Sequence, residues 1–422
     1  MKPLNKIRRI LAVQLMFLFL MGCQSVTQMD EVPTDGELGS STPTVPVLMD
    51  TDMRKENISF TIVGLSSGCA ADSGTGLYIP GIHALSYYDI EAQLSMVLCA
   101  QAGCSHSDNT CEAWLGENVR CFASYQGKWY VLDGGGGDGD LSLYEIDSIT
   151  RNKRTLCTWN VGTQSWEDVN SAFLSSGYAY VTLTSSTISA DGQTGTRHLD
   201  RVDLTSGDKE VLAENTDTVS FGFVSAGESQ VVLSVSTLSA IPQTREEYAV
   251  SHPNASDEDY MQYHSQFLEQ NVTQELRIYN WDMESYSVLE SAAAGYRFSG
   301  DPNIRYGMLF VYAVNDTLHV YDVDAGSDVE FLTAEGIINF WIMDGKVFYI
   351  TITDQGGCQI FYCPIDSKQP VQLGNDGNTH SMVFSLSLET HDHFIGLYNG
   401  KRVWISKENF YAEHYDHAIA LN

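Results

Sequence analysis

The stretch Gly127-Lys128-Trp129-Tyr130-Val131, followed by Leu143-Tyr144-Glu145-Ile146-Asp147, decides the fold. Aromatic and aliphatic residues recur with a period of two, which is typical of β-strands. Gly127 suits a tight turn in front of its strand, and Asp147 suits the start of a turn behind the later strand. The stretch therefore predicts antiparallel strands joined by short turns.

This pattern recurs along most of the chain. The other copies are Gly76–Ile79 with Leu85–Ile90, Gly177–Val181 with Leu199–Asp203, Gly227–Val232 with Leu276–Tyr279, Gly307–Val311 with Leu318–Asp322, Gly345–Tyr349 with Gln359–Tyr362, and a degenerate His393–Leu397 with Arg402–Ile405. The first four glycines stand 51, 50 and 50 residues apart. With a fourth strand after each copy, this spacing is the signature of a propeller blade. Seven copies predict an all-β, seven-bladed β-propeller; six or eight blades are the alternatives, because the end copies are degenerate.

The ring should close by pairing of its first and last blades, because an open propeller leaves exposed strand edges. Pro46–Asp50 and Asn409–Tyr415 are the two candidates for the closing strand.

An insertion at residues 236–274 interrupts the fourth blade. Thr244-Arg245-Glu246-Glu247 and Ser256-Asp257-Glu258-Asp259 are helix-start patterns with acidic first turns. Apolar and aromatic residues then follow at helical spacing on one face. We expect a short helical insertion that packs on its own blade; capping the channel or binding a partner are the alternatives.

The N-terminus has the order of a secretory signal: basic residues up to Arg9, then an apolar run from Ile10 to Leu20. Leu20-Met21-Gly22-Cys23 resembles the lipobox of bacterial lipoproteins. The resemblance implies cleavage after residue 22 and acylation of Cys23 by chains such as palmitate; the alternative is an ordinary signal with an incidental cysteine. Residues 23–56 are polar and broken by proline, which predicts a flexible tether ahead of a propeller domain at 57–422.

Charge narrows the partners. The chain has 23 Lys and Arg against 54 Asp and Glu, and removal of residues 1–22 changes the net charge from −31 to −35. Nucleic acid is excluded, because basic patches supply most of the affinity for it. Adsorption on an anionic bilayer is disfavoured for the same reason, which leaves the acyl chains as the contact with the membrane.

The sharpest side-chain cluster is Cys99, Cys104, His106 and Cys111, between the first two blades. Three thiolates and an imidazole are a donor set that zinc prefers, although the spacing is not that of a zinc finger. Disulfides are the alternative, because eight cysteines besides Cys23 make an even number and oxidation is permitted outside the membrane. In either case we expect a structural knot over residues 99–111.

The segment from Leu98 to Trp114 is also similar to a segment in many lipoproteins of anaerobic Gram-positive bacteria. In those proteins it lies inside a propeller related to the low-density-lipoprotein-receptor-like domain. The resemblance implies architecture and location, with no assigned activity.

These features favour a binding or scaffold module anchored by lipid to the extracytoplasmic side of the cell membrane. Its expected ligand is an unidentified protein or carbohydrate at a propeller face. The alternative is a carbohydrate-active or other propeller enzyme with carboxylates in the central channel. No residue is assigned a catalytic role.

Lipid attachment can be tested directly. The protein should incorporate a fatty-acid analogue and partition into detergent, with Cys23 as its first residue, because acylation and cleavage go together at a lipobox. Cys23→Ala should abolish both labelling and membrane association. A variant that stayed fully labelled and membrane-bound would contradict the assignment.

Overall fold

The computed structural model describes residues 58–59, 61–62, 70–71, 76–134, 139–160, 165–189, 192–293, 305–314, 316–352, 357–374 and 384–421. Cys23, the predicted signal and tether at 1–56, and the closing-strand candidate Pro46–Asp50 lie outside these ranges. None of the described helices combines the length and apolar character needed to cross a bilayer.

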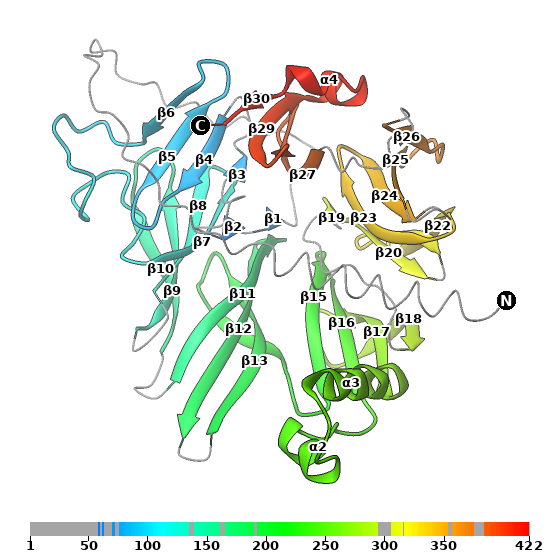
Figure 1. The fold of residues 1–422 in the computed structure, drawn as a ribbon. Coiled ribbons are helices and arrows are strands. Elements are labelled where there is room, and N and C mark those ends of the chain that lie inside the picture. The colour runs from blue at the N-terminus through cyan, green and yellow to red at the C-terminus, as the bar shows by residue number, and fades with distance from the viewer. Residues whose placement is uncertain are drawn as a thin grey trace. The chain divides into compact units, whose positions relative to one another are not determined.

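The described strands form seven antiparallel sheets, each with four consecutive strands of its own, as in Figure 1. Blade 1 has β3 (Ala70–Ala71), β4 (Gly76–Pro80), β5 (Leu85–Asp89) and β6 (Leu94–Val97). Blade 2 has β7 (Val119–Tyr125), β8 (Lys128–Gly134), β9 (Leu141–Asp147) and β10 (Lys153–Trp159). Blade 3 has β11 (Ser165–Ser175), β12 (Tyr178–Ser189), β13 (Gly192–Asp203) and β14 (Lys209–Glu214). Blade 4 has β15 (Val219–Ala226), β16 (Gln230–Leu238), β17 (Val272–Asn280) and β18 (Tyr286–Ala293).

The later blades repeat this order. Blade 5 has β19 (Arg305–Tyr306), β20 (Leu309–Val314), β21 (Thr317–Asp322) and β22 (Ser327–Thr333). Blade 6 has β23 (Ile337–Met343), β24 (Lys346–Ile352), β25 (Cys358–Pro364) and β26 (Val371–Leu373). Blade 7 has β27 (Phe384–Glu389), β28 (His393–Tyr398), β29 (Lys401–Ser406) and β30 (Ile419–Ala420). The predicted seven-bladed all-β propeller is confirmed.

The repeated glycine and aspartate occupy the expected turns. Gln126 and Gly127 have φ of 50° and 74°, and Ser176 and Gly177 have 49° and 81°. Two successive positive φ values match a type I′ hairpin, which requires a residue such as glycine. The Asp203 carboxylate accepts hydrogen bonds from the next turn, at 2.7 Å from Thr205 N and 2.9 Å from Ser206 N.

Apolar side chains connect the blades into a closed circuit. Separate buried clusters join blades 1 and 2, blades 2 and 3, blades 3 and 4, blades 4, 5 and 6, and blades 6 and 7. A last cluster packs Leu77, Tyr88 and Ile90 of the blade 1 region against Ile395 of blade 7. Each blade thus buries its faces against its neighbours.

The described residues contain no strand shared by the first and last blades, so Asn409–Tyr415 is wrong as a closing strand, whereas Pro46–Asp50 lies outside them and stays a prediction. All four strands of blade 7 come from the C-terminal part of the chain, and β30 pairs with β29 of the same blade. The candidate Asn409–Tyr415 instead contains the end of helix α4 (Lys407–Tyr411) and the start of the 3-10 helix η2 (Tyr415–His417). Among the described residues, apolar side chains make the contact between blades 1 and 7 at this seam.

Two short strands from the start of the domain lie on the inner edges of blades. Strand β1 (Ile58–Ser59) pairs with β11, the first strand of blade 3, and β2 (Thr61–Ile62) pairs with β7, the first strand of blade 2. Figure 1 draws both near the centre of the ring. This segment therefore occupies part of the channel side of two blades.

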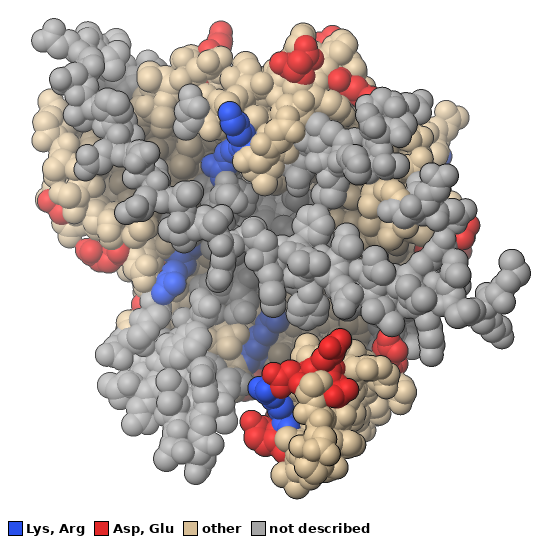
Figure 2. Space-filling view, in the orientation of Figure 1, with Lys and Arg blue, Asp and Glu red and all other residues tan. Residues whose placement is uncertain are grey.

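The insertion in blade 4 is shorter than predicted, because the β16–β17 ladder continues to the Leu238–Val272 pair. It contains α2 (Arg245–Ser251) and α3 (Asp257–Asn271), which start at the two predicted patterns, each with a capping box. Neither helix contains a buried residue. The Tyr248 ring stacks on Tyr263 with centroids 4.7 Å apart, so aromatic contacts join the two helices to each other. Figure 2 shows acidic side chains gathered over this region.

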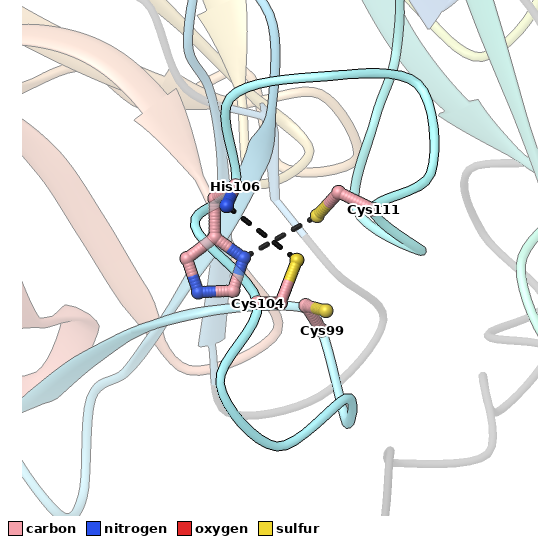
Figure 3. A group of neighbouring side chains, drawn as sticks. All are labelled: Cys99, Cys104, His106 and Cys111. Carbon is pink, nitrogen blue, oxygen red and sulfur yellow. Dashed lines mark hydrogen bonds between the residues drawn. The ribbon is translucent and has the colours of Figure 1, made fainter.

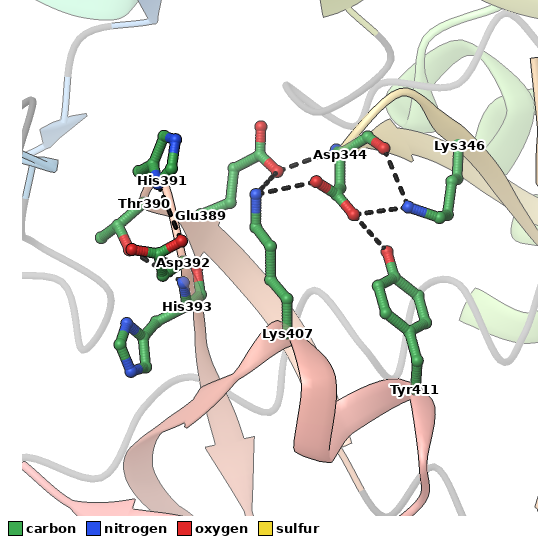
Figure 4. A network of polar contacts seen from close by, with 9 residues as sticks. All are labelled: Asp344, Lys346, Glu389, Thr390, His391, Asp392, His393, Lys407 and Tyr411. Carbon is green, nitrogen blue, oxygen red and sulfur yellow. Dashed lines mark hydrogen bonds and ion pairs between the residues drawn. The ribbon is translucent and has the colours of Figure 1, made fainter. Parts of the chain in front are cut away.

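A polar network fastens blade 6 to blade 7 (Figure 4). Asp344, in the β23–β24 turn, pairs with Lys346 at 2.5 Å and with Lys407 at 2.8 Å. The Tyr411 hydroxyl donates to the same carboxylate at 2.8 Å. Burial opposes ionisation of Asp344, but the two ammonium groups and this hydroxyl hold its pKa below the usual range.

Replacing Asp344 with Asn should lower the free energy of unfolding by about 2 kcal/mol at pH 7, because a charged acceptor of several hydrogen bonds is lost. Since the folded-state pKa is depressed, the carboxylate stabilises the fold above its unfolded pKa and stops doing so as pH falls through the folded pKa. The deficit should therefore shrink below about pH 4. Denaturant titrations at several pH values measure it.

Asp392→Asn is the matched control, because the Asp392 side chain is 73% exposed and pairs with an exposed histidine. Its effect should stay within about 0.5 kcal/mol. Equal effects of the two substitutions, or a deficit that persists in acid, would contradict the role given to Asp344.

Candidate metal centre and ligand cavities

The structure brings Cys99, Cys104, His106 and Cys111 together in the loop between β6 and β7 (Figure 3). One donor atom from each residue lies within 4.8 Å of the others. Zinc bound at about 2.3 Å to sulfur holds tetrahedral ligand atoms about 3.8 Å apart. Small side-chain shifts would close the set, so this Cys3His group can bind a metal.

Local turns explain the convergence. Gly103 and His106 adopt positive φ values of 74° and 56°, which are typical of turns. The Cys104 N–H donates to Gln101 O at 3.3 Å, and the Cys111 N–H donates to Asp108 O at 3.1 Å. Cys104 and Cys111 are therefore each positioned by a backbone turn.

Hydrogen bonds already hold the donor atoms toward one another. Cys104 Sγ accepts the His106 N–H at 3.4 Å, and His106 Nδ1 lies 3.3 Å from Cys111 Sγ. Burial raises the pKa of Cys111 to about 12. Burial also opposes ionisation of Cys99, but hydrogen bonds with the Gln101 and Glu112 backbone bring its pKa below the usual value.

The seven described cysteines are free thiols, and Cys69 lies outside the described residues. Geometry and donor chemistry fit a metal. The metal and disulfide interpretations predict different responses of the protein to chelator and to reductant.

The loop that carries the Cys3His group is fastened to both neighbouring blades. On blade 1, the Leu98 N–H donates to Leu85 O at 3.0 Å, and the Leu85 N–H donates to Ala113 O at 2.9 Å. On blade 2, Lys153 Nζ donates to Leu115 O at 2.7 Å. A constraint placed in this loop therefore acts on the link between the two blades.

Sequence reasoning missed a cavity of about 380 Å³ where turns of blades 2, 3 and 4 meet. Its lining residues are Tyr125, Gln126, Ser176, Gly177, Tyr178, Glu228 and Trp281. The Tyr178 and Trp281 rings pack edge to face at 4.8 Å, and the Arg201 guanidinium lies 4.0 Å from the Trp281 ring centroid. Gly127 and Gly177 marked two of the turns, but nothing in the repeat showed that their neighbours would converge.

A carboxylate buried between blades 2 and 3 bears on the enzyme alternative. Asp200 is 1% exposed, and its carboxylate accepts a hydrogen bond from Trp159 Nε1 at 2.5 Å. His198 Nδ1 lies 2.7 Å from the other oxygen. Trp159 belongs to blade 2 and Asp200 to blade 3, so this carboxylate joins two blades.

No family model matches this chain, and no curated protein sequence matches it. Among solved structures it is similar to an oligogalacturonate lyase from Vibrio parahaemolyticus, with 11% identity, a TM-score of 0.39 and coverage of 83% of this chain and 88% of the other. An oligogalacturonate lyase in complex with manganese is 10% identical, with a TM-score of 0.42 and coverage of 83% of this chain and 97% of the other. The propeller domain of the Trilobed protease from Pyrococcus furiosus is 9% identical, with a TM-score of 0.42 and coverage of 87% of this chain and 96% of the other. At these identities the likeness concerns the fold.

If the Cys3His group holds zinc, the purified protein should contain about one zinc per chain, because the set offers four protein ligands. A chelator should then lower the melting temperature, and His106→Ala should lower it as much as Cys111→Ser. Metal analysis and thermal melts measure both. His391→Ala, at an exposed histidine, is the control and should leave zinc content unchanged.

A disulfide would give the opposite pattern. Reductant would lower the melting temperature, chelator would not, and His106→Ala would have little effect. Protein without metal that melts unchanged with either reagent would contradict both versions.

Proposed function

We propose that this protein is a lipid-anchored, extracytoplasmic propeller that binds carbohydrate in the cavity between blades 2, 3 and 4. The observation that carries the proposal is the aromatic lining of that cavity by Tyr125, Tyr178 and Trp281. A sugar ring presents C–H groups on its faces and hydroxyl groups around its edge. Aromatic walls with a few polar groups match both parts of such a ligand.

The walls are held in place before any ligand arrives. Arg201 lies against both Trp281 and Tyr178, and its guanidinium forms an ion pair with Glu210 at 2.5 Å. Fixed rings lose little conformational freedom on binding, which favours affinity. The exposed Gln126 and Glu228 supply hydrogen-bonding groups at the same cavity.

Binding is favoured over hydrolysis by the composition of the lining. Glu228 is the one carboxylate among the described residues of this cavity, whereas glycoside hydrolysis generally uses two. The inner edges of blades 2 and 3, where channel carboxylates were the alternative, carry β1 and β2.

Zinc is proposed for the Cys3His group as a structural ion. Four protein donors complete a tetrahedral shell and leave no position for a substrate. The ion would supply a cross-link between the turns at Cys99, Cys104 and Cys111, and through the loop it would stiffen the link between blades 1 and 2.

The membrane location rests on the sequence. On this proposal residues 1–22 are removed, Cys23 carries the acyl chains, and residues 24–56 are the tether. A net charge of −35 after removal of residues 1–22 keeps the propeller away from an anionic bilayer, so that a ligand meets it from solution.

Trp281→Ala should weaken binding of an oligosaccharide identified on a glycan array at least tenfold, because the largest aromatic wall is lost. Calorimetry measures the affinity. Gln126→Ala removes an exposed polar group with little risk to folding and should weaken binding more modestly. Tyr286→Ala, on the same blade and 50% exposed, is the matched control and should bind normally.

A folded wild-type chain that binds nothing on the array would contradict the proposal. Equal losses for Trp281→Ala and Tyr286→Ala would also contradict it. Release of shorter sugars from a bound oligosaccharide would instead favour the enzyme.

A further inference from the structure

A second cavity, of about 370 Å³, lies between the Cys3His loop and blade 2. Its lining includes Cys111, Glu112, Trp114 and Glu117 from the loop, and Trp129, Asp133, Tyr144, Arg151 and Lys153 from the blade. We propose that this cavity binds a small zwitterion with an apolar part, of the free amino-acid type. The proposal is independent of carbohydrate binding at the other cavity.

Two cations of the cavity are left for a ligand. The Arg151 guanidinium lies 4.2 Å from the Trp129 ring centroid, and Lys153 Nζ lies 3.7 Å from that of Tyr144. Arg151 donates to Ser148 O, and Lys153 donates to Leu115 O at 2.7 Å. Neither cation forms an ion pair with a carboxylate of the described residues. A ligand carboxylate would accept charge-assisted hydrogen bonds from both cations, and such bonds are stronger than those between neutral groups.

Carboxylates line the same cavity. Asp133 is 8% exposed and accepts hydrogen bonds from Asn118 N at 2.7 Å and Glu117 N at 3.3 Å. Glu112 accepts the Ala100 N–H at 3.1 Å. With Glu117 the lining has three carboxylates against two cations. An anion without a positive group would be repelled, whereas an ammonium group beside the ligand carboxylate meets complementary charge.

One buried donor also lacks a partner. Trp129 is 1% exposed and lines the cavity, and its indole N–H has no hydrogen-bond partner among the described residues. Buried polar groups are nearly always hydrogen-bonded, so such a donor calls for a water or ligand atom. The rings of Trp114, Trp129 and Tyr144 supply apolar walls for a side chain.

The test uses the full chain in detergent and calorimetry with three probes. L-phenylalanine should bind, whereas N-acetyl-L-phenylalanine and L-phenylalaninamide, which each lack one charge, should bind at least tenfold more weakly. Arg151→Gln should weaken L-phenylalanine at least tenfold. Arg154→Gln is the matched control, because Arg154 lies three residues later on β10, pairs with Glu145 at 3.2 Å and does not line the cavity.

Glu117→Gln, at an exposed position, keeps the proposal testable if Arg151→Gln fails to fold. This substitution should weaken binding of L-phenylalanine and should not strengthen binding of L-phenylalaninamide. Trp281→Ala should not change L-phenylalanine binding, which separates this cavity from the carbohydrate site. No binding of L-phenylalanine, equal binding of the blocked probes, or equal losses for Arg151→Gln and Arg154→Gln would overturn the proposal.

Discussion

Apolar packing between neighbouring blades is the interaction on which the rest of this structure depends. A four-stranded sheet of this kind cannot bury both of its faces alone, so its stability comes from the blades on either side. The clusters run from blade to blade around the ring and return through Ile395 to Leu77. Among the described residues this last contact is made by apolar side chains and not by a strand shared between the two blades. Its strength should follow the temperature dependence of hydrophobic contacts, which weaken on cooling.

Both cavities and the Cys3His group lie where blades meet. Cys111, in the loop after β6, belongs both to the Cys3His group and to the wall of one cavity, and Glu112 next to it lines the same cavity. A metal held by Cys111 would therefore restrain that wall as well as the link between blades 1 and 2. The aromatic cavity depends in the same way on three separate turns, so its shape follows from how blades 2, 3 and 4 pack.

The repeat was readable because its signals are local. A glycine such as Gly177 is needed where φ is positive, and an aspartate such as Asp203 fixes the next turn through its own neighbours. The convergence of Cys99 with Cys111 also followed from short spacing. The closing seam, the pairing of β1 with β11 and the lining of the cavities join residues far apart in sequence. No periodicity encodes such contacts, because they depend on how complete blades pack.

The position of β1 decides how mechanical tension would enter the domain. On the proposed anchor at Cys23, the first described residues that a pull on the tether would reach are Ile58 and Ser59, which pair with blade 3. Among the described residues, two pairs join β1 to blade 3 and two more join β2 to blade 2. These short ladders would detach under load well before the packed blades separate. Detachment of β1 and β2 would then lengthen the tether while the propeller and any bound ligand stay folded.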